Sequence, residues 1–566
     1  VGNRSEYEAK HALENQQLVR SSHIHITYSC SVFRVGGVCI RYGLASLCRG
    51  MVRHTKCTMD GVAPGRCWSV CYTSRGREMN GKVRHSLRLT AMLYLLDYGA
   101  GNIQSLANSL TKLGYTYEWV REPSDISKAD KLLFPGVGSF ASAMDALHAK
   151  GYVEPLRAYI QSGKPLMGIC VGMQVLFEGS DESPGVQGLG IVPARVGRFA
   201  TQDALGRKAV PHMGWSLANV VEWERCADQR HELAKSYGMH DANPSHYYFV
   251  HSYRVAWDAN VAEWALTTTQ YGNEIFVSSI QHANVFATQF HPEKSGQAGL
   301  DLLAAWLRLE HVEPTTRVGR PVTSTEHMPT RRIVACLDVR SNDAGDLVVT
   351  KGESYDVRER GEQDAGASHV RNMGKPVELA QRYYDEGADE IAFLNITSFR
   401  NWALNDQPML SLLNVAAATI FVPLTVGGGI RDFTDPDGTF HPALKVAHAY
   451  FRAGADKVSI GSEAVYAVEQ LLARAKEAGD TSDDPVAAPA AALRGDTGIE
   501  QIAHAYGVQA VVVSVDPKRV YVESVEAAGV HAPSVVSGPD ERPETRGQPV
   551  SWWYKCTVKG LSLIHI

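Results

Sequence analysis

The sequence lacks any run of about 18 apolar residues, so no membrane-spanning helix is expected. It also lacks a strong charge of either sign: 56 basic side chains stand against 61 acidic ones, which argues against a general nucleic-acid binder. Only four of its 10 cysteines lie beyond residue 71, which favours a reduced compartment over a disulfide framework. The six earlier cysteines lack the paired CxxC spacing of a zinc site. We therefore expect a cytoplasmic protein without nucleic-acid or membrane partners.

The first 90 of the 566 residues differ in composition from the rest. They carry 14 Lys and Arg against 5 Asp and Glu, and they show no sustained helical or strand period. We expect residues 1–91 to be a basic extension that is disordered or not native to the protein. The alternative is a transit peptide, which is also rich in arginine and poor in acidic residues, and which would direct the protein to the plastid stroma.

Ordered structure is predicted from residue 92 onward. Leu93–Leu96 and Leu132–Phe134 are short apolar runs that end in Gly-rich turns, as strands of a parallel sheet do. Ser105–Leu113 lies between them and has the pattern of a helix, and Gly296–Leu307 has the pattern of a closing helix. Strands that alternate with helices predict an α/β domain over 92–312, with a parallel sheet and flanking helices.

A polar, proline-containing linker is predicted over 313–330, before a second alternating series. Helical patterns such as Pro376–Glu386 and Ala443–Ala453 separate its strands, which is the pattern of a (β/α)₈ barrel over 331–560. Only the first five strands are visible, so we expect an incomplete barrel, followed by an unmatched tail over 561–566. The five expected strands are Ile333–Asp338, Glu390–Ile396, Phe421–Val426, Lys457–Gly461 and Ala510–Asp516.

The sharpest local motif is the pentapeptide Gly168–Gly172, which has Cys170 at its centre. It follows a plausible strand and precedes a helix expected from Met173, so it matches the nucleophile elbow G-x-nucleophile-x-G with cysteine as the nucleophile. Small flanking residues permit the strained turn that exposes the thiol, and a helix N-terminus favours the thiolate. The alternative is an ordinary buried cysteine in a strand-turn-helix segment.

A second motif is the apolar strand Thr288–Phe290 followed by His291, Pro292 and Glu293. A histidine two residues before a glutamate can be oriented by that carboxylate and can accept the proton of a thiol. Alone, the motif is more typical of a surface His-x-Glu pair. Together with the elbow it predicts a Cys-His-Glu catalytic triad.

These motifs resemble those of the class I, or triad, glutamine amidotransferases. More narrowly, residues 92–310 are similar to the glutaminase subunit of the imidazole glycerol phosphate synthases. The resemblance implies that Cys170 attacks the glutamine carboxamide, that His291 acts as general base and then acid, and that Glu293 orients His291. The matching segments are Asp97–Asn102, Pro135–Gly138, Gly168–Gly172, Pro211–Trp215, Tyr247–Tyr253 and His291–Glu293.

The same resemblance implies the residues that bind glutamine. Backbone amides near Gly136, Gly138 and Val171 would form the oxyanion hole. Gln174 would contact the bound glutamine, and the alternative for it is a position on a helix surface.

Two aspartates are expected at the mouth of the barrel. Asp338 lies at the end of the first strand and Asp516 at the end of the fifth, and these strands lie opposite each other in an eight-stranded barrel. Two facing carboxylates suit general acid–base chemistry on a ring. The alternative is that both are helix caps.

The second half resembles the cyclase barrel of the same synthase family, and both halves on one chain resemble its fused fungal form. The resemblance implies that Asp338 and Asp516 are the acid–base pair and that Lys351, alternatively a solvated lysine, assists them. Backbone amides of Gly427, Gly428, Gly429, Gly461 and Ser462 would bind one phosphate, or these glycines only form tight turns. Arg332, Glu390 and Lys457 would form the ammonia gate, with Asp456 at the domain interface, or all four would form a structural salt-bridge layer.

The resemblance implies an imidazole glycerol phosphate synthase of histidine biosynthesis with no metal or other cofactor. Its substrates would be glutamine and phosphoribulosyl-formimino-AICAR ribonucleotide, and its two halves would dock within one chain. Because the family motifs stop at residue 560, the cyclase half is expected to be truncated at its C-terminus and inactive. The alternatives are a remnant that keeps only glutaminase activity or a docking role, and an amidotransferase that serves another acceptor.

Overall fold

The structure is a computed structural model, and its chain forms two compact units, Val1–Ser86 and Leu87–Ile566. In the first unit, β1 (Phe33–Val35) pairs with β2 (Val38–Ile40), and the expectation of disorder over 1–91 otherwise lies outside the described residues. No helix of the described part is long and apolar enough to cross a membrane. The structure describes residues 33–35, 38–40, 92–99, 101–223, 235–239, 245–309, 319–324, 326–341, 346–351, 371–396, 407–434, 438–477, 494–539, 549–558 and 562–563.

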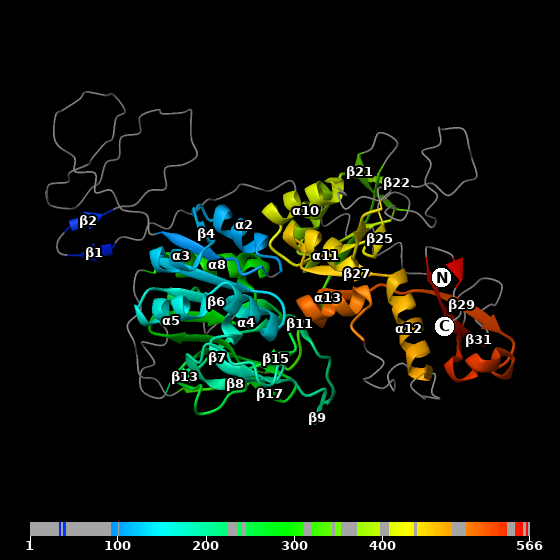
Figure 1. The fold of residues 1–566 in the computed structure, drawn as a ribbon, viewed down its shortest axis with the longest axis horizontal. Coiled ribbons are helices and arrows are strands. Elements are labelled where there is room, and N and C mark those ends of the chain that lie inside the picture. Colours follow the sequence, from blue (N-terminus) through cyan, green and yellow to red (C-terminus); the bar gives the residue numbers. More distant parts are fainter. Residues whose placement is uncertain are drawn as a thin grey trace, which may run out of the picture. The chain divides into compact units, whose positions relative to one another are not determined.

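The first domain is built on an eight-stranded sheet with strand order β12-β16-β17-β18-β6-β5-β3-β4. The expected strands Leu93–Leu96 and Leu132–Phe134 are confirmed, and so are the expected helices that begin and end the domain. Helices cover both faces of the sheet (Figure 1). The strands are β3 (Leu93–Leu96), β4 (Glu118–Val120), β5 (Lys131–Gly136), β6 (Leu166–Cys170), β12 (Asn219–Val220), β16 (Ala265–Tyr271), β17 (Glu274–His282) and β18 (Val285–Thr288); the helices are α2 (Gln104–Lys112), α3 (Pro123–Lys128), α4 (Phe140–Ala149), α5 (Val153–Gln161) and α8 (Gly296–Arg308).

The central strands of this sheet are parallel, as expected, and antiparallel strands extend the sheet at one edge. Strands β18, β6, β5, β3 and β4 are parallel, but β12, β16 and β17 are antiparallel to their neighbours. The reason is the short connection between β16 and β17, in which Gly272 adopts a φ of 59°. A two-residue loop joins only antiparallel strands, because a parallel pair needs a long crossover.

Smaller sheets extend the first domain beside the main one. The predicted linker contributes to one of them, because β19 (Gly319–Arg320) pairs with β13 (Glu222–Trp223). The remaining strands are β7 (Phe177–Ser180), β8 (Val192–Arg198), β9 (Gln202–Asp203), β10 (Gly206–Arg207), β11 (His212–Leu217), β14 (His246–His251) and β15 (Tyr253–Arg254).

The second domain contains a seven-stranded sheet with strand order β22-β21-β20-β23-β24-β27-β28. The five parallel strands expected from the sequence are confirmed in that order, and the antiparallel pair β21 and β22 extends the sheet beyond β20. The strands are β20 (Val334–Ser341), β21 (Leu347–Lys351), β22 (Arg371–Gly374), β23 (Glu390–Asn395), β24 (Leu424–Gly427), β27 (Lys457–Ile460) and β28 (Val511–Val513); the helices are α9 (Pro376–Asp385), α10 (Gln407–Thr419), α11 (Ala443–Arg452), α12 (Ser462–Glu477) and α13 (Gly498–Tyr506).

The expected end of the fifth strand at Asp516 is wrong. The parallel strand β28 ends at Val513, and Asp516 begins β29 (Asp516–Val522), which pairs antiparallel with β31 (Pro549–Val558). Ser514 N–H still donates to Ile460 O of β27 at 2.9 Å, and the chain then leaves the parallel sheet. The strand β30 (Val536–Pro539) and β32 (Ser562–Leu563), which lies in the expected tail, also pair with β31.

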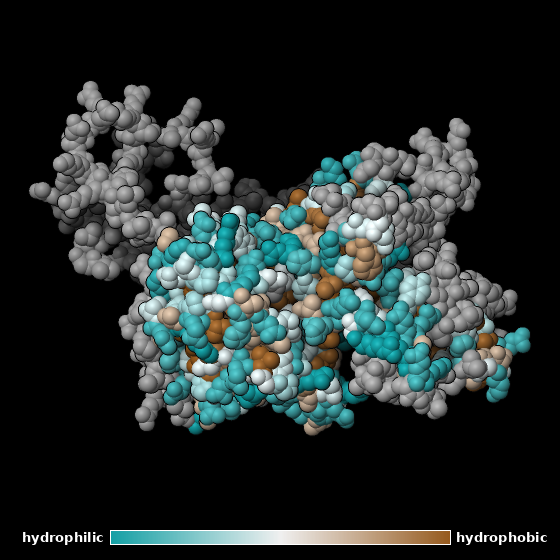
Figure 2. All heavy atoms as spheres, in the orientation of Figure 1, coloured by the Kyte–Doolittle hydropathy of each residue, from teal (hydrophilic) through white to brown (hydrophobic). Residues whose placement is uncertain are grey.

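Each domain has its own apolar core. The first core packs the central strands between their helices and includes the fully buried Phe134, Phe249 and Phe290. The second core is built around β23, β24 and β27 and includes Phe393. The face of the molecule in Figure 2 shows mostly hydrophilic described residues with scattered hydrophobic ones between them.

Candidate active site and charged interface

The nucleophile elbow is present, and glycines make it possible. Cys170 ends β6 with a φ of 54°, a left-handed conformation that is strained for any residue with a side chain. A Cβ on Gly172 would lie 2.1 Å from the carbonyl oxygen of Phe134, and a Cβ on Gly136 would lie 2.2 Å from the nitrogen of Gly172. A Cβ on Gly168 would likewise lie 2.7 Å from the oxygen of Gly172. The three glycines therefore let β5, β6 and the turn pack backbone against backbone.

The helix expected from Met173 is shorter and begins earlier than the sequence suggested. It is the single turn α6 (Val171–Gln174), which starts directly after Cys170. The chain enters the strand β7 at Phe177, so no second helical turn follows. The carbonyls after the turn bond the loop beyond β7: Leu189 N–H donates to Val175 O, and Ile191 N–H donates to Leu176 O.

The three expected triad residues lie together in the interior. Cys170, His291 and Glu293 are 5%, 6% and 5% exposed, which excludes a surface His-x-Glu pair. His291 follows β18, which pairs with β6, and Glu293 lies in the short 3₁₀ helix η1 (Pro292–Lys294). His291 Nδ1 and Glu293 Oε1 are 2.8 Å apart. The parallel β6–β18 pair thus brings two segments about 120 residues apart into one site.

The electrostatics of the triad favour a charged imidazole. Burial alone lowers the pKa of His291, but the neighbouring charges and hydrogen bonds of Cys170 and Glu293 hold that pKa well above its ordinary value. Burial likewise works to raise the pKa of Glu293, and the charge and hydrogen bond of His291 overcome it, so the pKa of Glu293 is lowered. The carboxylate of Glu293 therefore favours the charged form of the His291 imidazole.

Two of the expected oxyanion-hole residues adjoin Cys170. Gly136 is the register partner of Cys170 across the β5–β6 ladder, and Val171 follows Cys170 as the first residue of α6. Gly138, two residues after Gly136, has a φ of 127°, in the left-handed range.

Two glutamines connect the elbow to the strand that carries the histidine. Gln174 is buried, not on a helix surface, and its Nε2 donates to Tyr253 O and to Gln289 Oε1, each at 3.0 Å. Gln289 Nε2 in turn lies 3.6 Å from Cys170 Sγ. The sequence analysis gave Gln289 no role, although it precedes His291 by two residues and alternation in an extended chain places both on one side.

A buried histidine pair lies next to the triad. His212 and His251 come from the paired strands β11 and β14, and His212 Nδ1 lies 3.0 Å from His251 Nε2. His212 Nε2 contacts Ser216 Oγ at 3.0 Å, and His251 Nδ1 contacts Tyr253 O at 2.8 Å. Burial lowers the pKa of His251 to about 3 and the pKa of His212 well below its ordinary value, so both rings are neutral.

The cyclase-side carboxylates are only partly described. Asp338 lies in β20 on an exposed side of the sheet, and partial burial raises its pKa. The side chains of Asp516 and Lys351 lie outside the described residues, so the expected facing pair of carboxylates is untested. In the described open sheet, β20 and β28 are separated by β23, β24 and β27.

The candidate phosphate-binding glycines lie at the ends of adjacent strands. Gly427 ends β24 and is the register partner of Ser459 in β27, which leads into Gly461 and then into α12 at Ser462. A Cβ on Gly427 would lie 2.8 Å from Leu394 Cδ2. Gly428 and Gly429 have φ values of 100° and 73°, so the turn itself requires glycine. The structure therefore brings the two predicted loops together.

The predicted gate residues form one cluster, in which Glu390 and Lys457 are buried and Arg332 is partly exposed. Glu390 accepts from Arg332 Nη1 at 2.9 Å, from Lys457 Nζ at 2.5 Å and from Thr425 Oγ1 at 2.7 Å. Burial lowers the pKa of Lys457, and the charge of Glu390 opposes that shift. Lys457 Nζ also lies 5.9 Å from the ring centroid of Tyr248 in the first domain. The cluster is thus a salt-bridge layer at the end of the barrel strands that contacts the other domain.

Asp456 links residues of both domains. Its Oδ2 lies 2.7 Å from Lys294 Nζ and accepts from Leu424 N–H, while its Oδ1 accepts from Asn102 Nδ2. Lys294 also donates to Ser105 Oγ, and Asn102 accepts from the backbone N–H of that same serine. The network lies directly beside the triad, because Lys294 follows Glu293 in the chain.

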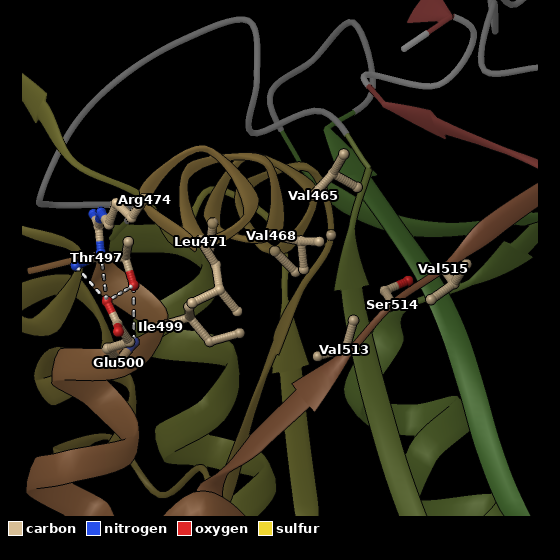
Figure 3. A pocket seen from close by; sticks show the side chains of 13 residues that line it. Val465, Val468, Leu471, Arg474, Thr497, Ile499, Glu500, Val513, Ser514 and Val515 are labelled. Carbon is tan, nitrogen blue, oxygen red and sulfur yellow. Dashed lines mark hydrogen bonds and ion pairs between the residues drawn. The ribbon is translucent and has the colours of Figure 1, made fainter. Parts of the chain in front are cut away.

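An apolar pocket of about 390 Å³ opens beside the edge strand β28. Figure 3 shows Val465, Val468 and Leu471 of α12 facing Ile499 of α13 and Val513 of β28. At one end, Glu500 and Thr497 form a capping box at the start of α13.

In the described ranges no group of three His, Cys, Asp or Glu side chains is placed to hold a metal ion.

Comparisons with known proteins match two parts of the chain to two protein families. Residues 94–307 match the family model "Glutamine amidotransferase class-I", and residues 332–483 match "Histidine biosynthesis protein". The chain is 49% identical over 471 residues to the imidazole glycerol phosphate synthase hisHF of Emericella nidulans, covering 83% of this chain and 79% of that protein. It is 50% identical to the hisHF of Schizosaccharomyces pombe, covering 82% and 80%, and 45% identical to the chloroplastic hisHF of Arabidopsis thaliana, covering 84% and 73%. The chain belongs to the imidazole glycerol phosphate synthase hisHF family.

Proposed function

We propose that this protein is an imidazole glycerol phosphate synthase of histidine biosynthesis. It hydrolyses glutamine and delivers the ammonia to phosphoribulosyl-formimino-AICAR ribonucleotide, and the products are imidazole glycerol phosphate, AICAR and glutamate. The observation that carries the proposal is the buried Cys170–His291–Glu293 arrangement at a strained elbow, in a chain that belongs to this family. The second family match, over 332–483, disfavours an amidotransferase that serves another acceptor.

The glutaminase reaction follows from the charges in the triad. The Cys170 thiolate attacks the carboxamide carbon of glutamine, and backbone N–H groups at Gly136, Gly138 and Val171 receive the developing oxyanion. The His291 imidazolium protonates the leaving nitrogen, the C–N bond breaks and ammonia leaves a thioester. His291 then takes a proton from water, which attacks the thioester, and the C–S bond breaks to release glutamate.

The positions of Glu293 and Gln174 support the same reaction. Glu293 holds the His291 ring through the 2.8 Å contact at Nδ1, which leaves Nε2 for proton exchange with sulfur and substrate. Gln174, buried beside the elbow, contacts the bound glutamine. Its position at the end of α6 fixes that contact relative to Cys170.

The ammonia passes to the second domain within the same chain. The two domains dock through Asp456, which contacts Lys294 and Asn102 of the glutaminase domain. The cluster of Arg332, Glu390 and Lys457 forms the gate at the barrel base. It is a layer of alternating charge whose ion pairs must separate to open a path, because the buried Glu390 bridges both cations.

The cyclase chemistry is assigned to the strand ends. Asp338 and Asp516 exchange protons with the substrate, assisted by Lys351, and the raised pKa of Asp338 brings that carboxyl closer to the pH at which proton exchange is efficient. The backbone amides of Gly427, Gly428, Gly429, Gly461 and Ser462 bind one phosphate.

The described barrel strands form an open sheet, so we expect a polypeptide of residues 92–566 to lack cyclase turnover when expressed by itself. The test supplies ammonium and the ribonucleotide substrate and measures imidazole glycerol phosphate, with a complete hisHF relative as the positive control. Turnover comparable to that of the relative would overturn this expectation.

The glutaminase assignment is tested separately with the full chain. Wild-type protein should release glutamate from glutamine, and His291→Gln should not, because the amide cannot exchange the required protons. A folded wild-type protein that releases no glutamate, with or without the ribonucleotide substrate, would contradict the proposed function.

A cytoplasmic location is part of the proposal. Cys170 and Cys336 are both free thiols, which fits a reduced compartment. The chloroplastic relative gives the alternative. Fractionation of cells that express the chain from its own transcript distinguishes the two, because a plastid protein co-sediments with stromal markers.

A further inference from the structure

Gln289 is the least expected polar group beside the nucleophile. Its side chain is 0% exposed, and its Nε2 lies 3.6 Å from Cys170 Sγ, within hydrogen-bond range for sulfur. Its backbone is fixed as well, because Gln289 N–H donates to Ser278 O on β17 at 2.9 Å. A buried carboxamide is costly unless its polar atoms are paired, so its presence at this point needs a reason.

The orientation of the Gln289 amide is set by a relay from the rest of the domain. Gln174 Nε2 donates to Gln289 Oε1, and it also donates to the backbone oxygen of Tyr253. If the Gln289 amide were rotated by half a turn, two NH₂ groups would face each other and its oxygen would face the sulfur. The relay therefore keeps the N–H side of Gln289 directed at Cys170.

The direction of this bond has a chemical consequence. An N–H donor stabilises a negatively charged sulfur more than a neutral thiol, because hydrogen bonds to charged groups are the stronger ones. His291 reaches the same sulfur, so the thiolate receives two donors from one strand end. Two donors from a rigid segment also hold the sulfur in a single rotamer on the strained elbow.

We infer that Gln289 is a positioning residue for the nucleophile: its carboxamide, oriented by Gln174, selects the thiolate form and one rotamer of Cys170. The inference deepens the proposed glutaminase function and rests on it. During the reaction the charge leaves sulfur when the C–S bond forms, so this hydrogen bond is strongest before attack and again after the thioester is hydrolysed. Gln289 then acts on the rate of attack rather than on glutamine binding.

The test uses the full chain and two readouts that a merely structural role does not move. The first is the pH dependence of Cys170 alkylation by iodoacetamide, followed by mass spectrometry of the Cys170 peptide. In Gln289→Leu the midpoint of that profile should move up by about one pH unit, since about tenfold of thiolate stabilisation is lost. The second is glutaminase kinetics, in which kcat should fall about tenfold with little change in KM.

Gln281 provides a matched control. It is also a buried glutamine, on β17, and it bonds Tyr237 and the backbone of Ala283 without touching the elbow. Gln281→Leu should cost stability but leave the alkylation profile and the kcat of the remaining folded protein unchanged. If Gln289→Leu does not fold, Gln289→Glu keeps the size of the side chain and should disfavour the thiolate even more, because it places a like charge beside sulfur.

The outcomes separate the inference from the proposed function. A folded Gln289→Leu or Gln289→Glu variant with the wild-type alkylation profile and kcat would overturn the inference, whatever the wild-type activity. A shifted profile in a protein that releases no glutamate would support the positioning role and overturn the proposed glutaminase. A loss confined to KM would assign Gln289 to glutamine binding and would also overturn the inference.

Discussion

The glutaminase domain buries its candidate catalytic side chains, whereas the cyclase segment leaves apolar and acidic residues on an open sheet. Cys170, His291 and Glu293 lie in the interior of the first domain. In the second domain Ile333 and Val513 are 67% and 52% exposed, and Asp338 lies on an exposed side of β20. The difference follows from topology: two adjacent parallel strands complete the first site, but a barrel site needs contributions from strands around a closed ring.

The candidate sites also differ in whether their residues come from adjacent strands. The triad needs only β6 with α6 and β18 with η1, and all four elements belong to the described residues. The candidate phosphate-binding loops need β24 and β27, which are likewise adjacent. The proposed acid–base pair is different, because Asp338 lies in β20 and Asp516 lies beyond the end of β28, in a separate antiparallel sheet. Adjacent strands therefore bring together the triad and the candidate phosphate-binding loops, whereas the two aspartates come from strands that are not adjacent.

The largest effect is expected from a substitution that removes the glutaminase activity and leaves the cyclase segment unchanged. Cys170→Ala should lower the kcat of glutamate release by about a thousandfold or more, because no other group supplies the nucleophile. The melting temperature of the variant should stay close to that of the wild type, since alanine fits the same backbone. Glutamate release at the wild-type rate in a folded Cys170→Ala protein would remove the triad assignment.

The next effect acts where the two domains meet. Asp456→Ala should reduce the free energy of unfolding by about 3–5 kcal/mol, because it leaves the buried Lys294 ammonium without its carboxylate. Urea unfolding followed by circular dichroism measures the loss. Lys294→Met combined with Asp456→Leu should recover most of it, and a double variant as unstable as Asp456→Ala would show that the ion pair is not the cause.

A glycine substitution should separate packing from catalysis. Gly172→Ala should destabilise the glutaminase domain by about 2–3 kcal/mol, because its new Cβ would lie 2.1 Å from Phe134 O and force backbone shifts. Gly185→Ala is the control: its φ of 95° is positive, unlike that of Gly172, but nothing lies within 4 Å of its Cβ position, so only about 1 kcal/mol of backbone strain is expected. Equal losses in the two variants would contradict the packing argument.

The last effect is a pH dependence of the first domain, which builds up gradually over several pH units. His212 and His251 have lowered pKa values when folded and titrate normally when unfolded, so the unfolded state binds more protons below about pH 6.5. Stability should therefore fall as pH falls from about 6.5 toward 3, by up to about 1.4 kcal/mol per pH unit for each histidine. Urea midpoints across this range measure the slope, and His251→Gln should reduce it. An unchanged slope would assign the acid sensitivity to other groups.

Much of this fold follows from patterns visible in the sequence. Apolar runs that end in glycine or acidic residues predicted β3, β5 and the five parallel barrel strands, because buried parallel strands are near-continuously apolar. The antiparallel extension of β16 and β17 was missed, since a buried strand of either orientation has the same composition. The early end of β28 was missed because Asp516 looks like a strand-end residue, and only the position of Pro517 hints otherwise.

The residues of the candidate site also differ in how well the sequence predicts them. Cys170 and His291 were found because their neighbours carry a rare pattern of glycine and proline. Gln289 was not, because a glutamine in a strand has no pattern of its own, and its role depends on the distance to a sulfur atom in another strand. The sequence alone does not reveal a residue whose role depends on a neighbour that is close only in the folded structure.

The backbone contacts of Gly136, Gly168 and Gly172 imply that selection acts on them separately from selection on the cysteine. A side chain at any of the three collides with a neighbouring main chain, so each is constrained for as long as the domain folds, whether or not it still hydrolyses glutamine. Cys170 is constrained only for as long as the chemistry is needed. Among descendants of such a chain, retained glycines around a replaced cysteine would therefore identify a lineage that lost the activity and kept the fold.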